Sequence, residues 1–189
     1  MVMEIFPGIE THIIDSNILD MIKDIEEISL LPEPVISWKK SIEQLDTPLH
    51  FGVVNFDKLE KYNENSGIDL LLKSISDNCN EVFKNYAIDY SKRNYLPMPE
   101  YESFIFFKYL ESNQERMFFE DILNGKIKRV ALKYFINDDY DGGDIYFPRF
   151  DITIKPEKNK LLVFPSNYIY SIIEKPVIKG VKYQVSTWF

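Results

Sequence analysis

Three carboxylates in the second half of the chain have the residue type to bind a metal ion: Glu120, Asp121 and Glu174. A site built from oxygen ligands alone favours Mg²⁺, Ca²⁺ or Mn²⁺ over a redox-active iron(II). Glu120 and Asp121 are adjacent, however, so on a strand their side chains would point to opposite faces. We therefore expect no metal site here and interpret Asp121 by itself as a solvated or capping carboxylate.

Nitrogen and sulfur ligands are scarce in this sequence. The chain has two histidines, His12 and His50, and one cysteine, Cys79. The histidines lack the spacing of a zinc site, and one thiol can form neither an intrachain disulfide nor a cysteine-based zinc site. We expect both histidines at the surface or at a sheet edge, and Cys79 as a buried thiol.

The last apolar run, residues 181–188, has the alternation of a strand. Its two faces carry different side chains, with Val181, Tyr183, Val185 and Thr187 on one and Lys182, Gln184, Ser186 and Trp188 on the other. Successive side chains on a strand point to opposite faces. Lys182 is therefore predicted to project away from the Val/Tyr face, beside a candidate binding pocket.

The elements that would position Lys182 are short strands. Apolar runs separated by turn residues occupy 103–110, 128–136, 144–147, 151–154, 160–164, 167–173 and 181–188. Asp141-Gly142-Gly143-Asp144 and residues 156–160 read as tight turns. Many short strands at such spacing are typical of a sandwich or barrel of the jelly-roll kind.

The first half of the chain is predicted to hold supporting elements. Residues 3–14 read as strands broken at Pro7-Gly8, a short helix is predicted over 18–28, and short strands are predicted around Trp38 and over 50–56. Apolar residues at helical spacing from Ser66 to Tyr86 predict a long amphipathic helix that packs on the outer face of a sheet.

Composition limits the classes of partner. A formal net charge of −8 disfavours a phosphate-tracking surface, so we expect no nucleic acid. No apolar run approaches 18 residues and the N-terminus lacks the pattern of a signal peptide, so we expect no membrane association and a cytoplasmic location in the producing cell. Twelve Tyr and 14 Phe suit sheet surfaces and protein interfaces.

The segment from Tyr134 to Phe147, YFINDDYDGGDIYF, resembles the "YLND-acidic-aromatic-x-GG-x-x-x-F" segment of prolyl-4-hydroxylase-like oxygenases, which depend on iron(II) and 2-oxoglutarate. Pro156, residues 162–166 and residues 176–188 continue the same pattern in the same order, and phage-type members share it. The resemblance covers about residues 102–189. It implies an α+β fold with a double-stranded β-helix (jelly-roll, cupin-like) core over 101–189. Residues 1–100 would supply strands and supporting helices of the same domain.

In such relatives two histidines and one carboxylate hold the iron. The first His lies two residues before the Asp, and the second lies four residues before the Pro of a Pro-Val pair. Asp121 fits the carboxylate, but Phe119 and Ile172 stand at the two histidine positions. Neither can ligate a metal, and His12 and His50 lie too early in the chain for a shift of register to restore the triad. The resemblance therefore implies a residual metal position at Asp121, but no metal and no catalytic residue.

The family's basic anchor for the distal carboxylate of 2-oxoglutarate corresponds to Lys182, and Tyr109 and Ser186 would supply nearby hydroxyls. Alternatively, Lys182 pairs with Asp121 or Glu174 in a pocket that no longer takes a ligand, which is the interpretation we favour. The two apolar side chains at the histidine positions would fill a formerly polar cavity. We therefore expect that this pocket has become core.

Three functional hypotheses follow from the resemblance. The leading one is a pseudoenzyme without cofactor that serves as a structural or protein-binding component through protein partners or self-assembly, for example in the neck, tail or capsid of a phage virion. The second is an active dioxygenase with a non-standard metal site, which would use Fe(II) and 2-oxoglutarate to hydroxylate a peptide or small molecule. The third is a sensor that binds 2-oxoglutarate at Lys182 without chemistry.

Overall fold

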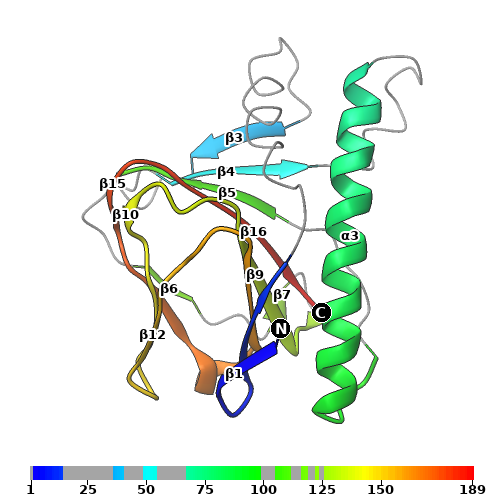
Figure 1. Cartoon of the computed structure of the whole chain (residues 1–189), viewed down its shortest axis with the longest axis vertical. Helices are drawn as coiled ribbons and strands as arrows, with labels where there is room; N and C mark the ends of the chain where they lie inside the picture. Colours follow the sequence, from blue (N-terminus) through cyan, green and yellow to red (C-terminus); the bar gives the residue numbers. More distant parts are fainter. Residues whose placement is uncertain are drawn as a thin grey trace.

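The computed structural model describes residues 2–14, 36–40, 49–54, 67–98, 105–111, 116–118, 122–123 and 126–189. The main elements of this part are two antiparallel sheets and one long helix, to which two short strand pairs are added. This arrangement agrees with the predicted α+β jelly roll (Figure 1). The helix predicted over residues 18–28, together with Phe119 and Asp121, lies outside the described residues. In the described part, no helix is both long and apolar enough to cross a membrane.

The large sheet has eight strands that come from both halves of the sequence. In spatial order they are β1 (Val2–Phe6), β2 (Ile9–Ile13), β13 (Lys160–Pro165), β9 (Val130–Phe135), β16 (Lys182–Trp188), β5 (Ile105–Tyr109), β4 (Leu49–Val54) and β3 (Ile36–Lys40). β16 lies between β9 and β5, with Gln184 opposite Phe135 on one side and Phe107 on the other. The predicted break at Pro7-Gly8 is confirmed as the turn between β1 and β2.

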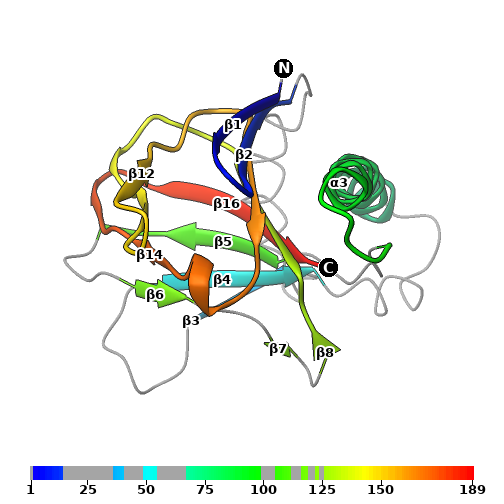
Figure 2. The ribbon, with the colours of Figure 1, turned by 90° about the horizontal axis from the view of Figure 1, so that it is seen from below.

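The small sheet faces the inner surface of the large one. Its strands, in order, are β12 (Ile152–Ile154), β11 (Ile145–Phe147), β14 (Ile172–Glu174) and β6 (Arg116–Phe118). Two further pairs join β7 (Ile122–Leu123) to β8 (Lys126–Ile127) and β10 (Asp141–Gly142) to β15 (Val177–Lys179). Helix α3 is seen end-on in Figure 2 on the opposite side of the large sheet.

The predicted strand over 167–173 is partly wrong, because its first residues form a 3-10 helix, η2 (Tyr168–Tyr170), before β14 begins at Ile172. The Asn167 side chain accepts a hydrogen bond from the Ile169 backbone N–H at 2.9 Å. This bond caps the turn and offers the backbone an alternative to a strand ladder.

Helix α3 (Gly67–Arg93) covers the outer face of the large sheet, as predicted. Cys79, Phe83, Ala87 and Tyr90 recur at helical spacing and are buried, while Asp77 and Lys84 are exposed. The Phe83 ring meets the Tyr134 ring of β9 edge-on, with centroids 6.4 Å apart. The apolar stripe therefore fixes which side of the helix faces the sheet.

The core between the two sheets is apolar at one end. Its buried members come from both sheets: Ile9, Ala131, Phe135, Ile145, Phe147, Ile154, Leu162, Phe164, Ile172 and Trp188. Phe147 of the small sheet packs perpendicular to Phe164 of the large sheet, with centroids 5.2 Å apart. Because side chains alternate along a strand, every second residue of these strands also points into the space between the two sheets.

Candidate functional site

The polar face predicted for β16 points into the space between the sheets. Lys182, Gln184 and Ser186 are each at most 1% exposed, and Trp188 on the same face belongs to the apolar core. The sequence expectation for Lys182 is confirmed in this respect. A central strand of the large sheet thus places three polar side chains where most residues are apolar.

Lys182 is a buried ammonium with one hydrogen bond to a main-chain carbonyl. Its Nζ donates to the Gly143 oxygen at 2.8 Å and lies 4.9 Å from the centroid of the Tyr109 ring and 5.3 Å from that of Phe135. Rings at this distance stabilise a cation through their quadrupoles. Burial nevertheless lowers the pKa of Lys182 to about 8, because the attraction of Glu174 does not offset desolvation and the repulsion of Lys133.

Glu174, on β14, is the counter-charge of this interior. Its Oε1 accepts hydrogen bonds from Lys133 Nζ at 2.9 Å and from Gln184 Nε2 at 3.3 Å, and the carboxylate also accepts from Tyr109. Desolvation raises the pKa of Glu174, but the charges of Lys133 and Lys182 and these hydrogen bonds outweigh it and lower the pKa to about 2. Glu174 is therefore ionised at neutral pH.

Some polar atoms of this cluster lack a partner. Among the described residues, Glu174 Oε2, Gln184 Oε1 and the Tyr140 hydroxyl are buried and form no hydrogen bond. The three buried side chains Lys133, Glu174 and Lys182 carry one more positive than negative charge, and the partly buried Asp144 also attracts Lys182. Two buried lysines can bind or orient an anion electrostatically, and in this chain the anion between them is the Glu174 carboxylate.

Of the predicted anchors, Tyr109 and Ser186 both join the cluster. Tyr109 lies beneath the Lys182 ammonium, and Ser186 Oγ accepts a hydrogen bond from Gln184 Nε2 at 3.0 Å. The predicted ion pair of Lys182 with Glu174 is wrong, because the direct ion-pair partner of Glu174 is Lys133 and Lys182 attracts Glu174 only at longer range. The alternative partner, Asp121, lies outside the described residues. The sequence reasoning missed Lys133, whose signal was a lysine between Ala131 and Phe135 in an otherwise apolar run.

The environment of Ile172, one of the two positions where the resemblance implies a histidine ligand, does not fit an iron site. Ile172 is 1% exposed and packs in the apolar core, and its backbone pairs with Phe118, the last described residue before Phe119. An aliphatic side chain offers no lone pair to a metal. Within the described ranges, which do not include Asp121, no three His, Cys, Asp or Glu side chains are grouped so that they could hold a metal ion.

The Gly142-Gly143 pair shapes the wall beside Lys182. Both glycines have positive φ, 81° and 72°. A Cβ on Gly142 would lie 2.4 Å from the Pro176 oxygen, and one on Gly143 would lie 3.1 Å from Lys182 Cδ. Side chains would therefore strain the backbone and displace β15 or the lysine. The glycines of the conspicuous DGGD segment let the chain approach Lys182 closely.

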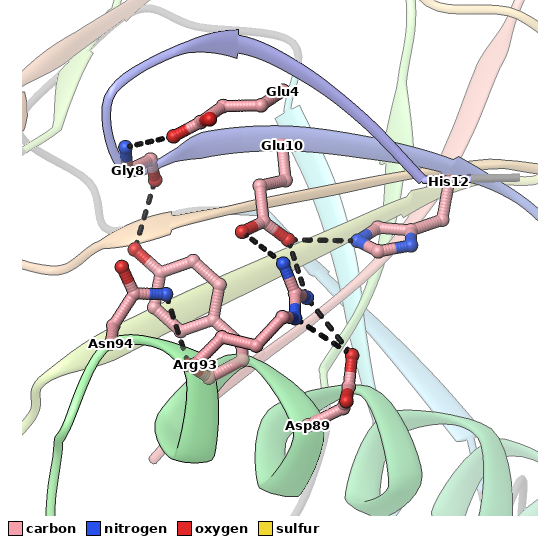
Figure 3. A network of polar contacts seen from close by, with 8 residues as sticks. Glu4, Gly8, Glu10, His12, Asp89, Arg93 and Asn94 are labelled. Atoms are coloured by element: carbon pink, nitrogen blue, oxygen red, sulfur yellow. Dashed lines mark hydrogen bonds and ion pairs between the residues drawn. The ribbon is translucent and has the colours of Figure 1, made fainter.

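A second buried carboxylate, Glu10 of β2, lies on the outer face of the large sheet (Figure 3). The Arg93 guanidinium of α3 donates to its Oε1 and Oε2 at 2.6 and 2.7 Å, and His12 Nε2 donates to Oε2 at 3.2 Å. Arg93 also pairs with Asp89. His12 is 2% exposed, so the prediction of a surface position was wrong for this residue. The cluster joins the helix to the sheet.

Solved structures with a similar fold include prolyl hydroxylases. One from Trichoplax adhaerens, in complex with a hypoxia inducible factor oxygen degradation domain peptide fragment, superposes with a TM-score of 0.66 at 14% identity over 96% of this chain and 82% of that chain. A Pseudomonas putida prolyl-4-hydroxylase gives 0.64 at 12% identity, with 96% and 91% covered. The viral collagen prolyl hydroxylase of Paramecium Bursaria Chlorella virus-1 gives 0.61 at 14% identity, with 96% and 88% covered.

Comparison by sequence adds no relative to these structures. No protein-family model matches this chain, and no curated protein matches it. At such low identity the structural likeness establishes a shared fold, and function must be argued from the site itself.

Proposed function

We propose that this chain is an oxygenase-fold protein that has lost iron-dependent hydroxylation and serves as a structural or protein-binding component. The observation that carries the proposal is the environment of Ile172. An iron ligand is expected there by resemblance, whereas the residue present is aliphatic, buried and part of the apolar core.

The interior charges support the same proposal. Lys133 and Glu174 form a direct ion pair at 2.9 Å, and Glu174 also attracts the lysine at the anchor position, Lys182. An interior whose basic groups already interact with a protein carboxylate has less need of a bound co-substrate. We therefore propose that neither Fe(II) nor 2-oxoglutarate is a resident cofactor.

The direct test is an anaerobic titration of the full chain with Fe(II) and Mn(II), with and without 2-oxoglutarate, followed by calorimetry. We expect no saturable binding. Binding of about one metal ion per chain would refute the proposal and would direct attention to Asp121 and to ligands outside the described residues.

One double variant, compared with the parent, distinguishes the loss of metal ligands from the loss of the space that a metal ion needs. The double substitution Phe119→His with Ile172→His restores the histidine types at both positions. If the core is closed, the double variant is less stable than the parent and still binds no iron, because the imidazole at position 172 would be buried without an assured partner. Stoichiometric iron binding by the double variant alone would mean that the ancestral space persists.

The binding role rests on exposed apolar side chains. Tyr95, Ile178 and Tyr168 are 96%, 72% and 62% exposed, and aromatic residues are enriched at interfaces. We propose protein partners or self-assembly, with a phage virion as the assembly to examine first. Light scattering of the purified chain and mass spectrometry of particles from the producing cell test this. A monomer that is absent from every particle would remove the assembly role.

A second candidate function is binding of 2-oxoglutarate, either by an active dioxygenase with a non-standard metal site or by a sensor. The observation in its favour is that Lys182 and Tyr109 lie together inside the barrel. Conversion of 2-oxoglutarate to succinate in equal measure with product would establish the enzyme. Saturable binding in the presence of chelator, without turnover, would establish the sensor.

A further inference from the structure

The interior cluster has the form of a receptor for one carboxylate group. Donors from three strands converge on Glu174: Lys133 from β9, Gln184 from β16 and Tyr109 from β5. The carboxylate itself comes from the opposite sheet, on β14. Charged donors and several N–H or O–H groups directed at one oxyanion are the features by which proteins hold free carboxylates.

We infer that Glu174 is the resident occupant of a carboxylate-binding position between the two sheets. The intact chain is therefore closed to free carboxylates at this position, and truncation of the Glu174 side chain opens it to a small monocarboxylate. The inference deepens the proposed function, on which it rests for the view that no co-substrate occupies this interior.

The charge balance explains why the position requires an anion. With Glu174 present, the cluster holds two lysines and one carboxylate, all with side chains at most 5% exposed. Without it, two ammonium groups would share the interior and repel each other, and the partly buried Asp144 would remain to attract Lys182 alone. A buried charge without a partner is costly, so a diffusible anion of suitable size gains affinity from the same groups that now hold Glu174.

Two buried oxygens that accept no hydrogen bond explain why the intact chain does not bind a second carboxylate here. Glu174 Oε2 and Gln184 Oε1 are buried acceptors. A free carboxylate that approached Lys182 would bring two more acceptor oxygens and a like charge beside Glu174. Only a group that donates hydrogen bonds, such as water, suits those two atoms.

The size of the ligand follows from the truncation. Glu174→Ala removes one methylene and the carboxylate group, which together match acetate. The probe is therefore sodium acetate, compared with sodium chloride at equal ionic strength, and the readout is the melting temperature of the variant with chelator present.

Two matched variants provide the controls. Glu174→Gln keeps the volume filled, so acetate has no space. Ile172→Ala opens space on the same strand, two residues earlier on the same face, but the lining is apolar. We expect acetate to raise the melting temperature of Glu174→Ala in a saturable way, by about 3–6 °C at ten times its dissociation constant, and to leave both controls and the parent unchanged.

The same comparison decides the matter if Glu174→Ala does not fold in chloride. Refolding is then carried out in each salt, and recovery in acetate alone supports the inference. Equal recovery, equal failure, or an equal acetate effect in Ile172→Ala overturns it. Saturable binding of acetate or 2-oxoglutarate by the parent chain in chelator overturns it as well. Iron binding by the parent would refute the proposed function and leave the acetate result intact, so the two failures are distinguishable.

Discussion

Two buried glutamates hold this molecule together in different ways. On the outer face of the large sheet, both oxygens of Glu10 accept hydrogen bonds from the Arg93 fork, and His12 adds a third (Figure 3). In the interior, Glu174 receives all its described hydrogen bonds at Oε1, while Oε2 receives none. Arg93 is 38% exposed, whereas Lys133 and Lys182 are enclosed.

From this difference we interpret the Glu10 cluster as a structural contact between helix and sheet, and the Glu174 cluster as a carboxylate-binding position. A contact between helix and sheet is stabilised when one planar guanidinium donates hydrogen bonds to both oxygens of a carboxylate. The interior cluster keeps an extra cation and unpartnered acceptors, which packing alone would not select, since apolar residues of similar volume are often at least as stabilising. The following substitutions test whether the two clusters respond as this comparison requires.

Glu174→Ala should have the largest effect. Removing the carboxylate leaves two enclosed ammonium groups, and loss of one partner of a buried pair costs about 3–5 kcal/mol of unfolding free energy. Urea denaturation in chloride buffer measures it. A loss below that of the corresponding Glu10 variant would contradict the contrast between the clusters.

Glu10→Ala should cost less, about 2 kcal/mol, because the partly exposed Arg93 can turn to water and still pair with Asp89. Denaturation of Glu10→Ala and of the double variant Glu10→Ala with Arg93→Ala gives the coupling between the two residues. A coupling energy near zero would mean that the hydrogen bonds between Arg93 and Glu10 do not contribute to the free energy of unfolding.

His12 should make the outer cluster sensitive to pH. Burial lowers the pKa of His12 below 6.5, although Glu10 opposes the shift. The unfolded chain therefore takes up the proton first as the pH falls, so the free energy of unfolding declines below about pH 6.5 until the pH reaches the pKa of His12 in the folded chain. Melting curves of the parent and His12→Gln between pH 7 and 5 should diverge, with the parent losing more. Parallel curves would show that His12 does not titrate in this window.

Lys182→Met should have the smallest effect at pH 7, within about 1 kcal/mol, because Lys133 and Glu174 remain as a balanced pair. The folded pKa of Lys182, about 8, lies below the usual 10.5, so the unfolded chain binds more protons between these values. Parent stability should accordingly rise relative to Lys182→Met from pH 8 to 10.5. A large loss at pH 7 would mean that Lys182, and not Lys133, is the essential partner of Glu174.

Much of the fold could be predicted because alternation and turn residues lie close together in the sequence. The strands ending near Phe147 and Trp188, the turn at Pro7-Gly8 and the helix face through Phe83 all follow local rules. The Asn167 cap and the short β10 and β15 pair were missed, because a side-chain hydrogen bond and a two-residue ladder leave little periodic signal.

The site was predicted only in part, for a related reason. Alternation on one strand placed Lys182 in the interior, but the partners of Glu174 come from other strands, and Gln184 meets Tyr109 across 75 residues of sequence. The polar residue Lys133 occurs in a run read as apolar. Which buried polar groups meet is decided by the register between strands, and local patterns do not encode it.

The place of β2 in the large sheet has a consequence for the order in which the chain is made. β2 pairs with β1 and with β13, so residues 9–13 gain their second neighbour only when residues 160–163 are available. At about 5–20 residues per second, translation of the intervening chain takes on the order of 10–30 s. During that interval the β2 edge of the hairpin is open as well as the β1 edge, which stays open in the finished sheet. A nascent-chain complex halted before residue 160 should expose the β2 edge to chaperones that recognise unpaired strands.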